Sequence, residues 1–161
     1  MKLFAIIFLS LMSITENSCH KKFELIKATS QEWHAGREEA GYGTYYELTI
    51  VTGENSDNLI FDKMWVGKDF FEVQTFQKGK KMRNNLFSKG DTVTIRVNKA
   101  TRIKPMPFVI KDEGKEESNI KNKNLPPKDY DGAALLSYVY KGKRKYFEIK
   151  EFIKIDPLYY P

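Results

Sequence analysis

The side chains that could catalyse a reaction or hold a metal are scarce in this sequence. It contains one cysteine, Cys19, and two histidines, His20 and His34. A zinc site needs several Cys, His or acidic ligands at close spacing, and these three residues do not form such a set. A catalytic triad would have to use His34 as its base, and no serine lies in a nucleophile-elbow pattern. We therefore assign no catalytic residue, no metal and no cofactor.

Carboxylates could instead act in pairs, as in glycosidases, which hold two of them about 5 to 9 Å apart. Glu38 and Glu39 are adjacent, as are Glu116 and Glu117, but neighbours on a strand point to opposite faces. The stretch 129–132, Asp-Tyr-Asp-Gly, is similar to the start of a calcium loop but lacks the later glutamate. These carboxylates leave one alternative interpretation of the chain open, an exported hydrolytic enzyme.

Basic residues form two clusters in segments with loop-like composition. In chain order the clusters are Lys78, Lys80, Lys81 and Arg83, then Lys141, Lys143, Arg144 and Lys145. Charged loops often only solubilise a surface and keep strand edges apart. The sharper hypothesis is an anion-binding surface for an envelope glycan, an acidic lipid or an envelope protein.

The N-terminal segment decides where the rest of the chain is delivered. Lys2 is followed by an uncharged apolar run from Leu3 to Ile14, and a short polar stretch then leads to Cys19. This order is that of an export signal. A membrane-spanning helix needs about 20 apolar residues, so the run is too short to be one.

At Ser18 and Cys19 the segment resembles the signal of a bacterial lipoprotein precursor, in which a small residue precedes a cysteine that becomes lipidated. The resemblance covers only residues 1–19. It implies a signal at 1–18, lipidation of Cys19, a tether at 19–22 and anchoring in the cell envelope. The outer membrane is the expected site, with the domain facing the periplasm or the cell surface. An ordinary secretory signal remains the alternative, since Glu16 stands where such signals usually carry an apolar residue.

Composition indicates one folded domain. Aromatic residues make up 14% of the 161 residues, enough to build a core without disulfides. The net charge is +6, and it is unchanged by removal of residues 1–19, because Lys2 and Glu16 cancel. A basic protein could bind nucleic acid, but an exported one rarely meets any, so we expect none as a partner.

Apolar residues alternate with polar ones at a period of two, which predicts strands. The predicted strands are 23–28, 45–52, 59–66, 70–76, 92–97, 135–140 and 146–155. The second, third and fourth follow one another through short connections, as in a meander. The glycine-rich stretch 30–43 predicts turns or a bulged strand edge, and the last predicted strand is expected to carry a bulge near Lys150 and Glu151 or to be buried on both faces.

These elements predict an all-β fold, a single antiparallel β-sandwich or a small barrel, over residues 23–161. The stretch 111–124 within residues 104–131 holds one large apolar residue, Ile120, so residues 104–131 are predicted to be a mobile loop. We expect a lipid-anchored binding or structural module of the cell envelope. A periplasmic inhibitor or assembly partner that acts by protein contact is a further alternative.

Overall fold

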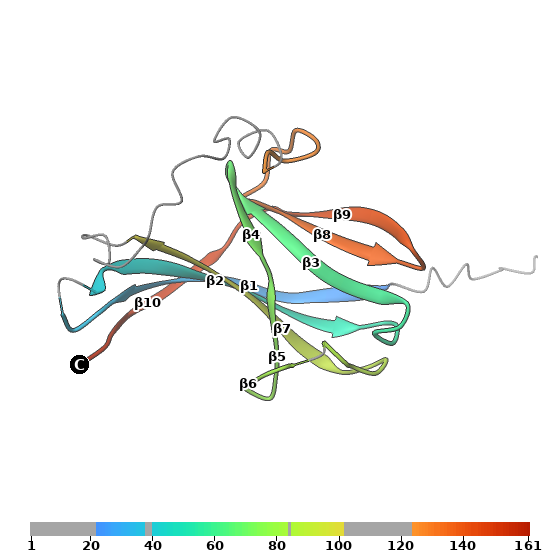
Figure 1. Ribbon diagram of the computed structural model, residues 1–161, viewed down its shortest axis with the longest axis horizontal. Coiled ribbons are helices and arrows are strands. Elements are labelled where there is room, and N and C mark those ends of the chain that lie inside the picture. The colour runs from blue at the N-terminus through green and yellow to red at the C-terminus, as the bar shows by residue number, and fades with distance from the viewer. Residues whose placement is uncertain (1–21, 38–39, 84, 102–123) are drawn as a thin grey trace, which may run out of the picture.

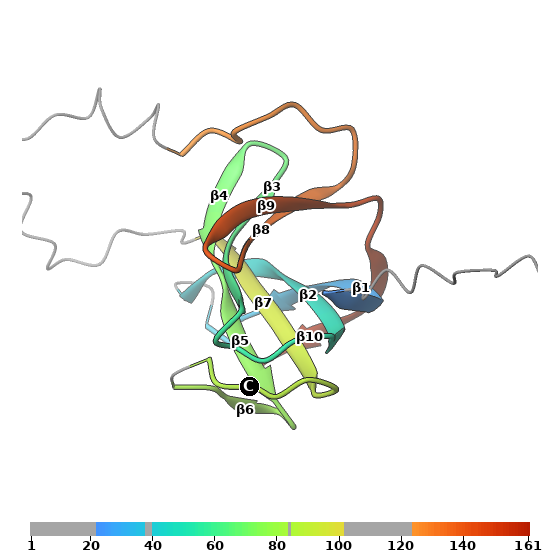
Figure 2. The ribbon, with the colours of Figure 1, turned by 90° about the vertical axis from the view of Figure 1, so that its right-hand side faces the viewer.

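The computed structural model describes residues 22–37, 40–83, 85–101 and 124–161 (Figures 1 and 2). The predicted signal at 1–18, the lipidation site Cys19, tether residues 19–21 and residues 104–123 of the predicted loop lie outside these ranges. Those predictions therefore stay predictions.

All regular secondary structure of the described residues is β. The strands are β1 (Phe23–His34), β2 (Tyr42–Thr52), β3 (Leu59–Val66), β4 (Asp69–Glu72), β5 (Gln74–Gln77), β6 (Lys80–Lys81), β7 (Thr92–Thr101), β8 (Ala134–Tyr140), β9 (Lys143–Ile149) and β10 (Ile153–Tyr159). They form a six-stranded sheet of order β10-β1-β2-β7-β5-β6 and a four-stranded sheet of order β4-β3-β8-β9. The four-stranded sheet lies over one end of the six-stranded sheet (Figure 1). The predicted all-β sandwich is confirmed.

The core fills the space between the two sheets. Leu48 and Ile50 of β2 pair with Ile95 and Val93 of β7, and all four side chains are fully buried. They meet the inward face of the four-stranded sheet, which contributes Leu59, Phe61, Met64, Ala134, Leu136, Tyr138 and Ile149. Burial of a side chain of this size contributes about 1.5 to 3 kcal/mol. Because the core and the side chains packed on it all lie within residues 23–152, we expect residues 20–161 to fold without the preceding segment.

The first strand is longer than predicted. It runs to His34 and has 12 residues, where the sequence predicted a short strand and then turns. From Thr29 onward β1 is paired on both sides, with β2 and with β10. Backbone hydrogen bonds to two neighbours outweigh the weak strand propensity of the polar residues in this stretch. Gly43, expected in a turn, lies inside β2 opposite Trp33.

The predicted meander is wrong, because β2 lies in the six-stranded sheet and β3 in the four-stranded sheet. Two of the predicted strands also divide between the sheets. The stretch 70–76 breaks at Val73 into β4 of one sheet and β5 of the other (Figure 1). The stretch 146–155 breaks where a bulge was expected, and β10 then joins β1 as a parallel neighbour. A period of two marks which side chains share a face but cannot tell which sheet the strand joins.

The six-stranded sheet extends past its partner. β1, β2 and β7 have 12, 11 and 10 residues, whereas β3, β8 and β9 have 8, 7 and 7. The extra length carries the C-terminus and lies at the left of Figure 1, opposite the start of β1 at the right. Side chains at this far end are therefore presented on a sheet with no second layer from the described strands.

Candidate functional site

The outer face of the six-stranded sheet carries a row of large planar side chains. Trp33 of β1, Tyr45 of β2, Arg96 of β7 and Phe76 of β5 follow one another across neighbouring strands. The rings of Trp33 and Tyr45 stack with centroids 5.9 Å apart and an interplanar angle of 27°. The guanidinium carbon of Arg96 lies 5.3 Å from the Tyr45 ring centroid and 4.5 Å from that of Phe76. We call these four residues the aromatic row.

The backbone and neighbouring polar groups hold the aromatic row in place. A Cβ atom on Gly43 would lie 2.8 Å from the Trp33 indole, so the ring packs directly on the β2 backbone. The indole N–H donates to Oδ1 of Asn98 at 2.8 Å. Arg96 forms an ion pair with Glu47, the residue opposite it on β2. Rings fixed in this way lose little conformational entropy when a ligand binds.

Tyr45 is fixed at the far end of the sheet by a second tyrosine. Its hydroxyl lies 3.5 Å from the hydroxyl of Tyr160. This hydrogen bond, and then burial, raise the pKa of Tyr45 above its usual value of 10.0. Both causes favour the neutral phenol, so Tyr45 keeps its proton at physiological pH and can donate or accept a hydrogen bond.

The aromatic row remains accessible. The side chain of Arg96 is 37% exposed and that of Glu47 is 29% exposed, while Trp33, Tyr45 and Phe76 are half-buried. Partly exposed rings that are already held in position can contact a ligand without rearrangement. Rings bordered by amide, guanidinium and carboxylate groups suit a ligand that is flat on one side and rich in hydroxyl groups.

Sequence reasoning missed this row, although a signal for it was present. Leu48 and Ile50 fix the inward phase of β2, and Tyr45 belongs to the opposite, outward phase with Glu47 and Thr49. A large aromatic residue on the solvent-facing side of a strand is unusual, so this pattern indicates that Tyr45 is a candidate binding residue. The stacking of Tyr45 on Trp33 could not be read from the pattern, because it depends on the register of β1 against β2, in which Trp33 lies opposite Gly43, two residues from Tyr45.

His34, considered as a catalytic base, is instead part of an aromatic stack. Its ring lies between Tyr159, at a centroid distance of 5.1 Å, and Tyr42, at 6.4 Å. The acidic candidates do not form a site either: Glu38, Glu39, Glu116 and Glu117 lie outside the described residues. Within the described ranges no group of three or more His, Cys, Asp or Glu side chains could hold a metal ion.

The outer face of the four-stranded sheet differs around Trp65 and Leu135, which are shielded from solvent. Trp65 is only 5% exposed and Leu135 is fully buried, although both point away from the core between the sheets. The Trp65 indole N–H donates to the carbonyl of Asn124 at 2.9 Å, and the Tyr130 hydroxyl donates to the carbonyl of Gly67. Residues 124–131, the last part of the predicted mobile loop, therefore pack on this sheet.

The two predicted basic clusters lie at two tight hairpin turns. Lys78 and Gly79 have φ angles of 49° and 76°, and Lys141 and Gly142 have 48° and 74°. Two successive residues of positive φ are typical of the two-residue hairpin turn, where Lys is an uncommon first residue. The turns belong to different sheets, β5–β6 and β8–β9, so the structure does not merge the clusters into one surface.

The second cluster divides into paired and exposed members. Arg144 donates to Oδ2 of Asp62 at 2.7 Å and to the Ser137 hydroxyl, so its charge is already balanced. The ammonium groups of Lys141 and Lys145 lie 5.3 and 5.9 Å from the ring centroid of Tyr140. In the first cluster Lys78, Lys80, Lys81 and Arg83 are exposed.

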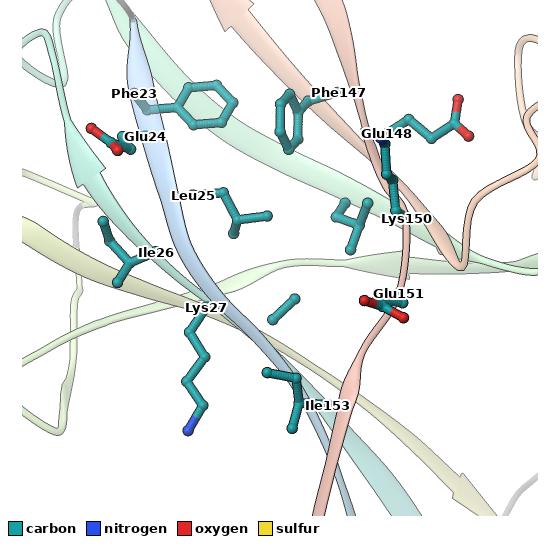
Figure 3. A pocket seen from close by; sticks show the side chains of 12 residues that line it. Phe23, Glu24, Leu25, Ile26, Lys27, Phe147, Glu148, Lys150, Glu151 and Ile153 are labelled. Atoms are coloured by element: carbon teal, nitrogen blue, oxygen red, sulfur yellow. The ribbon is translucent and has the colours of Figure 1, made fainter.

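An apolar groove of about 780 Å³ opens between β1 and the connection from β9 to β10 (Figure 3). Phe23 and Phe147 pack edge to face at one end of it with centroids 5.2 Å apart, and Leu25 lies next to them. Ile26 and Ile153 beside it are 57% and 56% exposed. Because β10 pairs with β1 only from Thr29 onward, the first half of β1 is an open strand edge here.

No helix of the described residues is long and apolar enough to cross a membrane. Comparison of the chain with models of known protein families, with curated proteins and with solved structures gave no match in any of the three.

Proposed function

We propose that this protein is a lipid-anchored module of the bacterial cell envelope that binds an envelope glycan through the outer face of its six-stranded sheet. The observation that carries the proposal is the aromatic row, in which Trp33, Tyr45, Arg96 and Phe76 cross adjacent strands. The N-terminal segment supports the anchor, since Cys19 follows a short apolar run as in a lipoprotein precursor.

A glycan fits the chemistry of this face. One side of a pyranose ring presents C–H groups, which pack on the electron-rich face of an aromatic ring. The sugar hydroxyl groups then need hydrogen-bond partners at the border, and the amides of Gln31 and Asn98 and the Arg96–Glu47 pair stand there. The net charge of +6 attracts an anionic polymer at longer range. An anionic envelope glycan is therefore the ligand class that we propose.

The test is glycan binding by a chain of residues 20–161. Sedimentation with insoluble peptidoglycan, and affinity electrophoresis in gels with alginate or neutral dextran, cover anionic and neutral polymers. Central aromatic and Arg contacts commonly account for 2 kcal/mol or more, so Trp33→Ala or Arg96→Ala should weaken binding about thirtyfold.

Tyr159→Ala is the matched control, because Tyr159 is 73% exposed and lies off the aromatic row. Its loss should leave glycan binding unchanged. Binding that survives Trp33→Ala in full, or a chain that binds single-stranded DNA and none of the glycans, contradicts the proposal. The second outcome is informative because aromatic and Arg side chains on a sheet also stack on nucleic-acid bases.

A second candidate is an assembly partner that captures an extended segment of another protein. The open edge of β1 beside the apolar groove favours it, since a strand added there would gain backbone hydrogen bonds and bury its side chains. A photo-crosslinking residue at position 26 should then trap a protein in the envelope. The same residue at Ile60, 45% exposed on the other sheet, is the control. Equal crosslinking at both positions removes this candidate.

A further inference from the structure

The start of β1 and the tip of the β8–β9 hairpin meet at one end of the sandwich, at the right of Figure 1. The ring of Phe23 packs edge-on against Tyr138 at 5.1 Å and Phe147 at 5.2 Å. Phe23 is the first residue of β1. The point at which the N-terminal tether reaches the domain is thus fixed beside this hairpin.

Lysines gather around one tyrosine at this end. The ammonium groups of Lys22, Lys141 and Lys145 lie 5.0, 5.3 and 5.9 Å from the ring centroid of Tyr140. Lys143, at the start of β9, is exposed beside them. We call Lys22, Lys141, Lys143 and Lys145 the basic pole.

The loop that adjoins the basic pole carries fewer acidic groups than the pole has lysines. The adjoining loop, whose Asn58 carbonyl accepts from the Lys141 N–H, carries Glu54 and Asp57. Glu54 accepts a hydrogen bond from the Tyr140 hydroxyl at 3.1 Å. Lysines with long apolar stems around an amphipathic ring are suited to the boundary between water and lipid headgroups.

The length of the tether relates this end to the membrane. A chain from Cys19 to Lys22 spans at most about 10 Å even when fully extended. With a lipid on Cys19, Lys22 stays within about one Debye length of the bilayer surface at physiological salt. From Phe23, β1 runs for 12 residues, about 40 Å, past Trp33 to His34.

We propose that the basic pole docks on anionic phospholipid headgroups of the membrane that holds the anchor, and so directs the far end of the six-stranded sheet away from the bilayer. This inference rests on the lipid anchor of the proposed function but not on the glycan. It assigns membrane binding to the second basic cluster and not to the first, because only the second lies at the anchored end.

The test compares two triple substitutions in the chain of residues 20–161, with phosphatidylglycerol-containing vesicles and pure phosphatidylcholine vesicles as probes. Lys141→Gln, Lys143→Gln and Lys145→Gln together should weaken cosedimentation with the anionic vesicles about a hundredfold. The reason is that each lysine near an anionic surface is worth about fivefold in binding. Lys78→Gln, Lys80→Gln and Lys81→Gln remove the same charge at the other hairpin turn and should weaken it less than tenfold.

Equal losses for the two triple variants would overturn the proposal, because the attraction would then be general charge. Equal binding of the unsubstituted chain to both kinds of vesicle would overturn it as well. The melting temperature should be unchanged in both variants, since exposed charges contribute little to stability. Trp33→Ala should keep vesicle binding and weaken glycan binding about thirtyfold. The first triple variant should weaken glycan binding no more than the second, which removes the same net charge, so each proposal can fail without the other.

Discussion

The two outer faces of the sandwich use the same residue types in opposite ways. On the four-stranded sheet, Trp65 and Leu135 hardly meet solvent, and the Trp65 indole is hydrogen-bonded to the carbonyl of Asn124. On the six-stranded sheet, Trp33, Tyr45 and Phe76 pack against neighbouring side chains but stay partly exposed to solvent. A covered aromatic residue stabilises the fold, whereas a fixed and uncovered one is available to a ligand. The comparison therefore predicts that stability depends on one face and binding on the other.

The largest expected effect is on the covered face. Trp65→Ala should lower the free energy of unfolding by about 3 to 5 kcal/mol, because it opens a cavity under the covering segment and removes the hydrogen bond to Asn124. Trp33→Ala should cost less than half as much, since its ring already meets solvent. Urea unfolding of both variants measures the difference. Equal losses would mean that the two faces are equally structural.

Gly43 tests how the aromatic row is seated. Its added Cβ would lie 2.5 Å from the Lys99 carbonyl oxygen and 2.8 Å from the Trp33 indole, so Gly43→Ala must shift either the backbone or the ring. We expect a loss of about 1 to 3 kcal/mol together with weaker glycan binding. Gly67→Ala is the control, because an added Cβ there would meet no other atom. Its only cost is the backbone strain of a non-glycine residue at a φ of +61°. It should cost about 1 to 2 kcal/mol and leave binding intact.

The smallest expected effects appear at alkaline pH, where one tyrosine on each face can be compared. The pKa of Tyr45 is raised first by its hydrogen bond to Tyr160, whereas burial raises that of Tyr130. A raised pKa in the folded state stabilises the protein below the ordinary value near 10, and this stabilisation is lost as pH rises through the folded-state value.

Tyr160→Phe should therefore lower the pKa of Tyr45 and leave that of Tyr130 unchanged. Absorbance at the tyrosinate band, with Tyr45→Phe and Tyr130→Phe to assign the transitions, follows both groups. A Tyr130 transition that moves with Tyr160→Phe would show that the two faces are coupled.

Much of the fold could be predicted, because it depends on local alternation. Leu48 and Ile50 in one phase of a strand, or Val93 and Ile95 in another, specify a strand with one buried face. What could not be predicted depends on pairing between distant residues. β1 extends to His34 because β10, more than a hundred positions later, pairs with it, and Val73 marks a change of sheet that no local pattern reveals.

The candidate site was harder to predict for the same reason. The basic clusters were visible because their lysines are adjacent in sequence, but Arg144 turned out to be paired with Asp62 across strands. The aromatic row brings together Trp33, Tyr45 and Phe76 from β1, β2 and β5. The outward phase of Tyr45 is visible in the sequence, but only the strand register brings Trp33 and Phe76 to the same face beside it.

The most direct test of the central claim uses the two tryptophans of the chain, one on each face. A Trp65→Phe chain reports on Trp33 alone, and a Trp33→Phe chain reports on Trp65 alone. Titration with solubilised peptidoglycan fragments or alginate oligosaccharides should change the emission of Trp33 in a saturable way and leave that of Trp65 constant. A saturable change of Trp65 with none at Trp33 would contradict the account, because the ligand would then bind the covered face.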